Sequence, residues 1–299
     1  MAAILLDGTA IAQQVYSELK HRVTTLGERG TRPGLAAILI GENAASKIYV
    51  KNKAHACHEV GLHSEVHRFA ADCTESEVLD MLRHLNADPA IHGILVQLPL
   101  PPQLDAERIL QSIDAGKDVD GFNWLNLGAI VAGRTLLAPC TPLGVMTMLD
   151  HAGIALEGRS AVVIGRSALV GKPLALMLIA RGATVSVCNS KTPDLALYTS
   201  LADILVVAAG KPGLVRGSMI KPDAVVIDVG INRLPDGKLG GDVDFASASR
   251  VASYIAPVPG GVGRMTVAML IANTVTAAER ITGVPSAHGL RRGNDRPGS

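Results

Sequence analysis

The feature that most restricts the fold is an alternation of short apolar segments with stretches of helical periodicity. Residues 35–40 (LAAILI) form an uninterrupted apolar run of strand length, 91–96 predict a second strand, and 44–60 predict a helix between them. The second half repeats the pattern, with apolar runs at 161–164, 184–187, 204–208 and 225–229. Apolar strands connected through helices predict parallel sheets covered on both faces. The expected fold class is therefore α/β.

Local signals mark the ends of several predicted helices. Gly61 stands where a C′ glycine would end helix 44–60. Thr74 and Glu77 form a capping-box pair that opens the next helix. A late stretch, 265–281, also carries helical periodicity. The tail 286–299 is polar and arginine-rich, and we expect it to be disordered because it cannot bury apolar area.

Composition excludes several classes of protein. Lys and Arg number 28 against 27 Asp and Glu, and only 3% of the 299 residues are aromatic, so neither a strongly basic nucleic-acid binder nor a base-stacking surface is expected. The four cysteines form no CxxC pair and no metal-ligand spacing with histidine, so we expect no metal site and a reducing compartment. We find no signal peptide and no apolar run near 20 residues, which predicts a cytoplasmic protein without a membrane partner.

A glycine turn in the second half is a candidate phosphate site. Strand 161–164 runs into Gly165 and Arg166, and Gly171 precedes the next helix. A strand, a glycine turn and a helix N-terminus can together bind an anion. The spacing matches neither GxGxxG nor a P-loop, so a tight strand–helix turn without a ligand is the alternative.

The end of the next strand bears on which dinucleotide would bind. NAD sites usually place Asp or Glu about 20 residues beyond the glycine turn. Here strand 184–187 is followed by Cys-Asn-Ser-Lys, with no carboxylate. Arg166, Ser190 and Lys191 would suit a 2′-phosphate, which favours NADP over NAD, although Lys191 could equally be a solvated surface lysine.

Polar residues in the first half suggest acid–base chemistry. Ser46, Tyr49 and Lys53 are spaced i, i+3 and i+7, so they share one helix face. A tyrosine and a lysine one turn apart can share a proton, and partial burial would lower the pKa of the lysine. The alternative is an amphipathic helix whose lysine reaches solvent. Gln97 follows a buried strand, where parallel sheets place ligand groups.

Three further candidates have competing structural interpretations. Asp118 and Asp120 are candidate ligand contacts, but either could fix a turn or cap a helix. Cys140, between two prolines in PCTP, could be a nucleophile, but a packed turn cysteine is favoured. The nine histidines fall in no metal or triad pattern, and we expect His55 and His58 at the surface.

Nine ordered segments together carry a family resemblance that extends from about residue 3 to about 282. They are SKIYVKNKA (46–54), GILVQLPLP (93–101), KDVDGF (117–122), PCTPLG (139–144), GRSALVGKP (165–173), GKPG (210–213), VIDVGIN (226–232), GDVDF (241–245) and PVPGGVG (257–263). The chain resembles the bifunctional methylenetetrahydrofolate dehydrogenase/methenyltetrahydrofolate cyclohydrolase family.

The resemblance implies two domains with a folate cleft between them. Residues 1–121, completed by the helix at about 265–282, would form the catalytic domain, and 122–264 a Rossmann-like NADP-binding domain. Family members are usually homodimers. The implied activity is NADP-dependent oxidation of methylene-tetrahydrofolate, followed by hydrolysis of the methenyl product to formyl-tetrahydrofolate, in one-carbon metabolism. Purine, histidine and methionine biosynthesis would draw on these products.

The resemblance also implies roles for individual residues. Lys53 matches the family's acid–base residue, Tyr49 stacks near the pterin and tunes the lysine, Gln97 holds the lysine, and Asp120 anchors the pterin. The residues matching folate-bordering positions are Pro259, Gly260 and Gly263. Those matching NADP contacts are Gly165, Arg166, Ser167, Ser190 and Ile231.

Two departures from the family pattern bear on activity. Arg264 replaces a usual proline and frees a backbone donor, so it could hold the acidic folate tail or loosen the turn. Asn189 replaces a common histidine beside the 2′-phosphate serine, which weakens the NADP assignment. The competing functions are a monofunctional NADP dehydrogenase of another small substrate, such as a shikimate-type enzyme, and a non-enzymatic NADP-sensing module.

Overall fold

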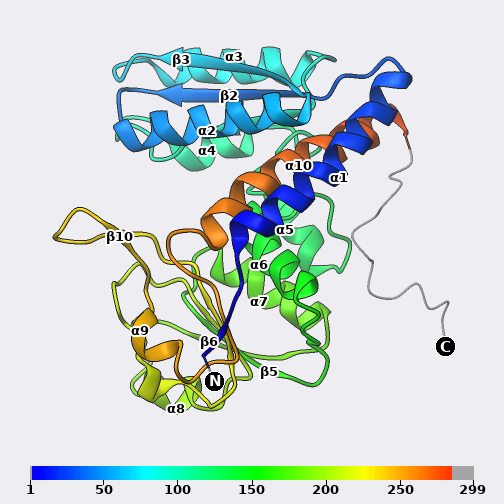
Figure 1. Cartoon of the computed structure of the whole chain (residues 1–299). Helices are drawn as coiled ribbons and strands as arrows, with labels where there is room; N and C mark the ends of the chain where they lie inside the picture. Colours follow the sequence, from blue (N-terminus) through cyan, green and yellow to red (C-terminus); the bar gives the residue numbers. More distant parts are fainter. Residues whose placement is uncertain (1, 285–299) are drawn as a thin grey trace. The chain divides into compact units, whose positions relative to one another are not determined.

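A computed structural model describes residues 2–284, so the predicted disordered tail, 286–299, lies outside the described residues. Two compact units are present, and each is drawn from separate parts of the chain. One, here called the three-stranded unit, comprises Gln14–Cys140 and the chain from Val267 onward. The other, the six-stranded unit, comprises the chain up to Gln13 and Thr141–Thr266. The path of the chain is coloured in Figure 1.

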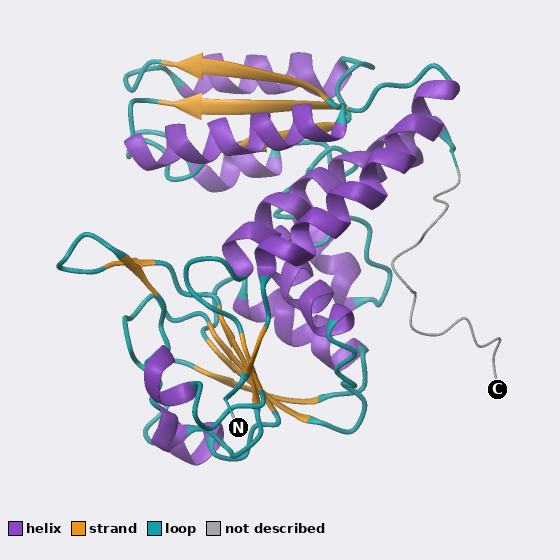
Figure 2. Cartoon of the chain, in the orientation of Figure 1, coloured by secondary structure: helices purple, strands orange, loops and turns teal. Residues whose placement is uncertain are grey.

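The three-stranded unit contains a parallel sheet in the order β3-β2-β4. These strands are β2 (Gly34–Ile40), β3 (His63–Phe69) and β4 (Gly93–Val96). The connecting helices are α2 (Ala44–Val60), α3 (Glu75–Ala87) and α4 (Ala106–Gln111), followed by α5 (Trp124–Val131). Most of α1 (Gly8–Glu28) and α10 (Val262–Thr282) also belongs to this unit. Figure 2 shows the strands of this sheet with helices packed against them.

Both faces of the central strand β2 are buried, as its continuous apolar run predicted. Ala36, Ile38 and Ile40 face a cluster that includes Val78 and Leu82 of α3, together with Ile109 of α4. The residues that alternate with them along β2, at 35, 37 and 39, point to the other face and are buried as well. A strand covered on both sides needs apolar residues at every position, which accounts for the LAAILI run.

The six-stranded unit contains a parallel sheet in the order β1-β11-β8-β7-β5-β6. Its strands are β1 (Ile4–Leu5), β5 (Ser160–Ile164), β6 (Thr184–Cys188), β7 (Ile204–Val207), β8 (Val225–Asp228) and β11 (Tyr254–Ile255). β5 pairs with β6 on one side and with β7 on the other. The chain therefore changes direction across the sheet at β5, and in open α/β sheets such a switch point is where ligands bind.

Helices cover this second sheet as well. The core on one face joins Val162 and Ile164 of β5 to Ala248 of α9 (Phe245–Ala248), and α8 (Leu195–Thr199) packs there through Leu195. Figure 1 shows α7 (Gly171–Ala180) on the opposite side from α8 and α9. The remaining elements are α6 (Cys140–His151), a 3₁₀ turn at Gly217–Met219, and a ribbon of β9 (Asn232–Arg233) with β10 (Leu239–Gly240).

The grouping of residues 122–140 differs from the predicted boundary near Gly121. This segment belongs to the three-stranded unit because its polar side chains bond there: Asn123 Nδ2 donates to Ile113 O (2.9 Å) and Asn126 Nδ2 to Ala115 O (2.9 Å). The late helix also joins this unit, as expected, since Asn273 Nδ2 donates to the Val119 carbonyl at 2.8 Å. It begins at Val262, three residues before the predicted start.

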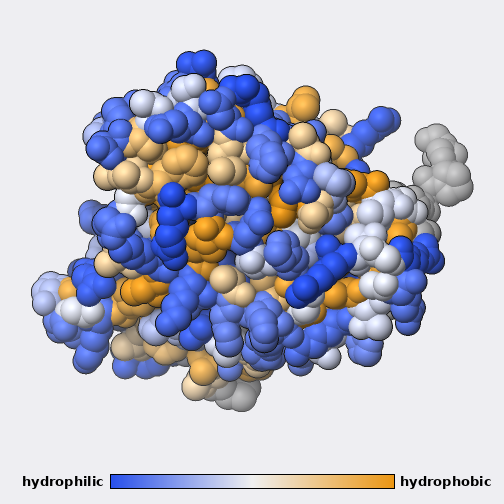
Figure 3. All heavy atoms as spheres, turned by 90° about the horizontal axis from the view of Figure 1, so that it is seen from above, coloured by the Kyte–Doolittle hydropathy of each residue, from blue (hydrophilic) through white to orange (hydrophobic). Residues whose placement is uncertain are grey.

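Surface hydropathy is mixed. On the face drawn in Figure 3, hydrophilic residues cover most of the surface, with hydrophobic patches between them. The exposed large hydrophobic side chains of the described chain include three on α5: Trp124, Leu125 and Val131. Within residues 2–284, no helix is both long enough and apolar enough to cross a membrane.

Candidate active site

Helix α2 presents three polar residues on one face, as their spacing predicted. Asn43 caps the helix by accepting a hydrogen bond from Ser46 N at 3.1 Å, and Gly61 ends it in the left-handed conformation at φ 92°. Ser46 and Lys53 are buried, whereas 39% of Tyr49 is exposed. The two caps fix the position of α2. Lys53 is therefore buried on this face, and the partly exposed ring of Tyr49 can contact a ligand.

Lys53 is held by an oriented amide. Its Nζ donates to Gln97 Oε1 at 3.2 Å, and Gln97 Nε2 donates to the Leu98 carbonyl at 2.9 Å. Because the amide nitrogen is committed to Leu98, the amide oxygen faces the lysine. Gln97 follows β4, and its backbone N–H continues the pairing to Ile38 O at 2.9 Å. The sheet thus sets the position of the amide, and the amide sets the position of the amine.

The two aspartates that the sequence left undecided have different surroundings. Asp118 is buried and accepts hydrogen bonds from Gly121 N (3.1 Å), Asn123 N (2.7 Å) and Asn126 Nδ2 (2.9 Å). Burial raises the pKa of Asp118 to about 6, although these bonds favour its charged form. Asp118 is therefore the residue that fixes the turn. Asp120 is half-buried, and no hydrogen bond from another described residue reaches its carboxylate.

Cys140 is packed rather than exposed. It is the first residue of α6 rather than a turn residue, and its thiol donates to Val119 O at 3.1 Å. Burial raises the pKa of this thiol well above its usual range, and the carboxylates of Asp120 and Asp118 raise it further. A thiolate is therefore strongly disfavoured, which agrees with the preferred packed interpretation. The charge of Lys53 lowers the pKa of the same thiol, so Lys53 and Asp120 act on one region of this unit.

Asn273 also contacts this region, and the sequence analysis did not single it out. Its amide donates to Val119 O (2.8 Å), Ala138 O (2.9 Å) and Cys140 Sγ (3.7 Å). The signal that could have found it is an asparagine that directly follows the apolar run 267–272 of the predicted late helix. It fixes the backbone directly before Asp120.

In the six-stranded unit, the predicted glycine turn lies at the switch point beside β5. Gly165 has φ 122°, and a Cβ there would collide with the Ala208 carbonyl oxygen. A Cβ on Gly171 would collide with Gly165 O. Ser167 Oγ accepts from Val170 N at 3.1 Å, which folds the loop and leaves the hydroxyl proton available to a ligand. Arg166 is exposed at the same turn.

The end of β6 exposes the residues expected to meet a 2′-phosphate. Asn189 Oδ1 accepts from Lys191 N (3.0 Å), and Asn189 N donates to Thr192 Oγ1 (3.0 Å). Asn189 therefore builds a tight turn, and Ser190 and Lys191 are exposed on it. The residue that departs from the family pattern has a structural role of its own here.

The glycine-rich turn before α10 is closely packed within the same unit. A Cβ on Gly8 would collide with Gly261 O, and Gly260 has φ 106°. Arg264 is exposed, and its backbone N–H donates to Gly261 O at 3.1 Å. The donor that replaces the usual proline is therefore satisfied within the turn. Pro259 and Ile231 are exposed, and a Cβ on Gly263 would lie 3.3 Å from Ile231 Cδ1.

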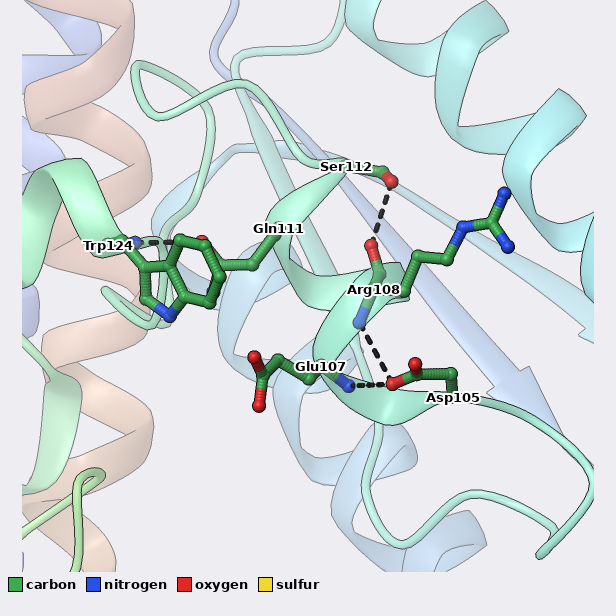
Figure 4. A pocket seen from close by; sticks show the side chains of 6 residues that line it. All are labelled: Asp105, Glu107, Arg108, Gln111, Ser112 and Trp124. Atoms are coloured by element: carbon green, nitrogen blue, oxygen red, sulfur yellow. Dashed lines mark hydrogen bonds between the residues drawn. The ribbon is translucent and has the colours of Figure 1, made fainter.

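A surface pocket of the three-stranded unit contains none of the predicted site residues. It is lined by Asp105, Glu107, Arg108, Gln111, Ser112 and Trp124. Figure 4 shows Asp105 capping the helix beneath it and Gln111 joined to Trp124. Arg108 already pairs with Glu75 at 2.9 Å. Among residues 2–284, no cluster of three or more histidines, cysteines and acidic residues could hold a metal ion.

Two family models match the chain. "Tetrahydrofolate dehydrogenase/cyclohydrolase, catalytic domain" matches residues 6–120, and "Tetrahydrofolate dehydrogenase/cyclohydrolase, NAD(P)-binding domain" matches residues 139–282. The chain is 54% identical over 294 residues to "Bifunctional protein FolD" of Nitrosospira multiformis, covering 98% of this chain and 100% of that protein. It is 56% identical over 280 residues to the Bordetella bronchiseptica protein of the same name, covering 94% and 99%.

Solved structures agree with these matches. The crystal structure of the bifunctional FolD methylenetetrahydrofolate dehydrogenase/cyclohydrolase from Campylobacter jejuni is 50% identical, with a TM-score of 0.92 over 94% of this chain and 100% of that one. The Trypanosoma brucei methylenetetrahydrofolate dehydrogenase-cyclohydrolase, complexed with NADP cofactor and an inhibitor, is 39% identical, with a TM-score of 0.90 over 94% and 99%.

Proposed function

The chain belongs to the tetrahydrofolate dehydrogenase/cyclohydrolase family, and from this premise we propose how its residues divide two activities. It is a bifunctional enzyme: an NADP-dependent methylenetetrahydrofolate dehydrogenase and a methenyltetrahydrofolate cyclohydrolase. Identity above 50% over nearly the whole chain favours this function over a dehydrogenase of another substrate or a non-enzymatic module.

The residues at the switch point fit a dinucleotide. Gly165 and Gly171 let the turn after β5 pack closely against Ala208 and against itself, and Arg166 offers an exposed cation beside it. We assign Gly165, Arg166, Ser167, Ser190 and Ile231 to NADP, with Arg166 and Ser190 on the 2′-phosphate. NADP held by these residues would supply the hydride acceptor for the methylene carbon. The two nitrogens that flank this carbon share the positive charge left when the hydride departs, so the protein's part in this step is to position the substrate.

The hydrolytic step needs a proton carrier. The observation that most directly supports Lys53 in this role is its hydrogen bond to Gln97. Lys53 Nζ takes a proton from the water that attacks the methenyl carbon and returns one to the departing nitrogen. Gln97 orients the amine through its side-chain oxygen, which lies 3.2 Å from Lys53 Nζ. Tyr49 supplies a partly exposed ring against which the pterin can stack, and Asp120 accepts hydrogen bonds from the pterin.

Several further assignments belong to the same proposal. Pro259, Gly260 and Gly263 border the folate, and Arg264 interacts with its acidic tail. The three-stranded unit is the catalytic domain, and the six-stranded unit is the NADP-binding domain. The enzyme works as a cytoplasmic homodimer in one-carbon metabolism, where its products feed purine, histidine and methionine biosynthesis.

One assay tests the two activities together. Purified protein is incubated with methylene-tetrahydrofolate and either NADP or NAD, while reduced cofactor and methenyl absorbance are followed. We expect reduction with NADP to exceed that with NAD, followed by methenyl decay faster than in buffer. Reduction without accelerated decay would remove the cyclohydrolase assignment. Absence of turnover with either cofactor would refute the enzymatic function.

A further inference from the structure

A single buried carboxylate holds the loops that follow two neighbouring strands of the six-stranded sheet. Asp242 is 0% exposed and lies in the GDVDF segment. Its Oδ2 accepts from Ala209 N (2.6 Å) and Gly210 N (2.8 Å). Its Oδ1 accepts from Lys211 N (2.8 Å) and Asn232 Nδ2 (2.8 Å). One side chain therefore binds three consecutive amides after β7 and one amide side chain after β8.

The space for this carboxylate is built into the neighbouring sequence. A Cβ on Gly230 would collide with the Asp242 carboxyl group, and a Cβ on Gly241 would collide with that of Asp228. Asp228 supports the arrangement from beneath, since its Oδ1 accepts from Asp242 N at 3.0 Å and its Oδ2 from Val243 N at 2.9 Å. Both glycines are required by the two buried carboxylates rather than by any ligand.

The loops that Asp242 holds lie next to the glycine turn. Residues 209–211 continue directly from Ala208, whose carbonyl oxygen would contact a Cβ on Gly165. Asn232 directly follows Ile231, which is exposed. Both loops start at the carboxyl ends of parallel strands beside the switch point, where a dinucleotide binds in this type of sheet. Asp242 itself is fully buried, so it can influence a ligand only through these loops.

We propose that Asp242 is a positioning residue for the dinucleotide: it locks the 209–211 loop and the Ile231–Asn232 segment into the shape that receives NADP. The proposal rests on the assignment of the glycine turn and Ile231 to the cofactor. The GKPG and GDVDF segments have no role in the chemistry described above. In this proposal, Asp242 of GDVDF holds the backbone of GKPG in place.

The test measures NADP binding directly by titration calorimetry, beside both activities. In Asp242→Asn an amide nitrogen replaces one carboxylate oxygen, so at least one buried amide loses its acceptor. The 209–211 loop and the Ile231–Asn232 segment then lose their fixed shape, so we expect the Kd and KM for NADP to rise about tenfold or more, which corresponds to about 1.4 kcal/mol. Methenyl hydrolysis, which uses Lys53 and needs no NADP, should stay within about twofold of the unsubstituted enzyme, below the effect of one lost hydrogen bond.

A control carboxylate lies at the opposite end of β7. Asp203 accepts from Ser160 N (2.9 Å) and Lys221 Nζ (2.6 Å), just before β7 and at the start of β5. Asp203→Asn should lower thermal stability while leaving the NADP Kd unchanged. A second variant, Asn232→Ala, cuts only the link between the two loops and should weaken NADP binding by about threefold, in line with the loss of one hydrogen bond.

The outcomes separate this inference from the proposed function. Unsubstituted protein that fails to bind NADP would refute the dinucleotide site itself. Unsubstituted protein that binds NADP, together with an Asp242→Asn variant that binds it equally well, would overturn the positioning role alone. The role would also be overturned if Asp203→Asn weakened binding as much as Asp242→Asn, or if Asp242→Asn and Asn232→Ala lost hydrolysis in proportion to binding.

Discussion

Lys53 is the residue on which the division of the two activities depends. Lys53→Ala removes the proton carrier, so methenyl hydrolysis should fall by about 10²–10⁴-fold, while the dehydrogenase, which needs positioning only, falls much less. The measurement is the two rates on one preparation. Lys51→Ala is the control, because Lys51 is an exposed lysine on the same helix. Hydrolysis that survives in Lys53→Ala would assign the proton transfer to another group.

Arg166 carries the choice between NADP and NAD. Arg166→Ala removes an exposed cation beside the glycine turn, and the loss of a charge-assisted bond to the 2′-phosphate should raise the KM for NADP about tenfold or more. The KM for NAD should change little, because NAD lacks that phosphate. Arg159→Ala, an exposed arginine at the other end of β5, serves as the control. Equal changes for both cofactors would show that Arg166 does not contact the 2′-phosphate.

The sequence identified single residues well where spacing alone was decisive. Ser46, Tyr49 and Lys53 lie on one face because α2 is regular. It could not separate Asp118 from Asp120, since the choice depends on Asn123 and Asn126, which both donate to Asp118 in the folded turn. The roles of Asn273 and Asp242 were not predicted for the same reason. Each side chain binds backbone groups from distant parts of the chain.

At the scale of elements, local sequence signals predicted the ends of helices closely. Strands that depend on pairing with distant segments were missed. Helix α2 spans 44–60 and ends at Gly61, and Thr74 with Glu77 forms the expected capping box. Strands β1 and β11 were not predicted, because each has only two residues and exists through its pairing with a neighbour. Helices α4 and α5 are short and were also not predicted.

Helices α1 and α10 are joined by a buried ion pair whose removal should be costly. Arg22 Nε and Nη2 donate to Glu279 at 2.8 and 2.7 Å, and Nη2 also donates to Thr276 Oγ1 at 2.9 Å. Glu279→Ala leaves the guanidinium buried without its partner, so the free energy of unfolding in urea should fall by about 3 kcal/mol.

A surface ion pair provides the comparison for that prediction. Arg83 pairs with Asp80 on α3, and both side chains are mostly exposed. Arg83→Ala should change the free energy of unfolding by less than about 1 kcal/mol, because water already solvates both charges. If the two substitutions destabilised the protein equally, burial would not be what makes the Arg22–Glu279 pair strong.

For the whole molecule, two buried carboxylates predict how stability depends on pH. Burial raises the pKa of Asp118 and of Asp228 from the ordinary value of 3.8 to about 6. The two carboxyl groups therefore bind a proton more tightly in the folded state than in the unfolded state. Their contribution is fully present below pH 3.8 and is lost as pH rises to about 6, with an upper limit of about 3 kcal/mol each.

The measurement is the free energy of unfolding at several pH values between 4 and 6.5, for the unsubstituted protein and for Asp118→Asn and Asp228→Asn. An asparagine cannot titrate, so each variant should show a smaller fall in stability as pH rises through this window. A steeper fall in the variants would mean that the backbone hydrogen bonds to these carboxylates outweigh burial and keep them charged at low pH.

The chain passes between its two units three times, at Gln13, at Cys140 and at Thr266. Neither unit is a continuous stretch of sequence, and the three-stranded unit receives Asn273 and Glu279 only from the last helix. During translation the N-terminal part leaves the ribosome first. The region around Lys53 therefore lacks its contacts with α10 until nearly the whole chain has been synthesised. A nascent chain that stalls or terminates before α10 would therefore complete neither unit and would carry neither activity.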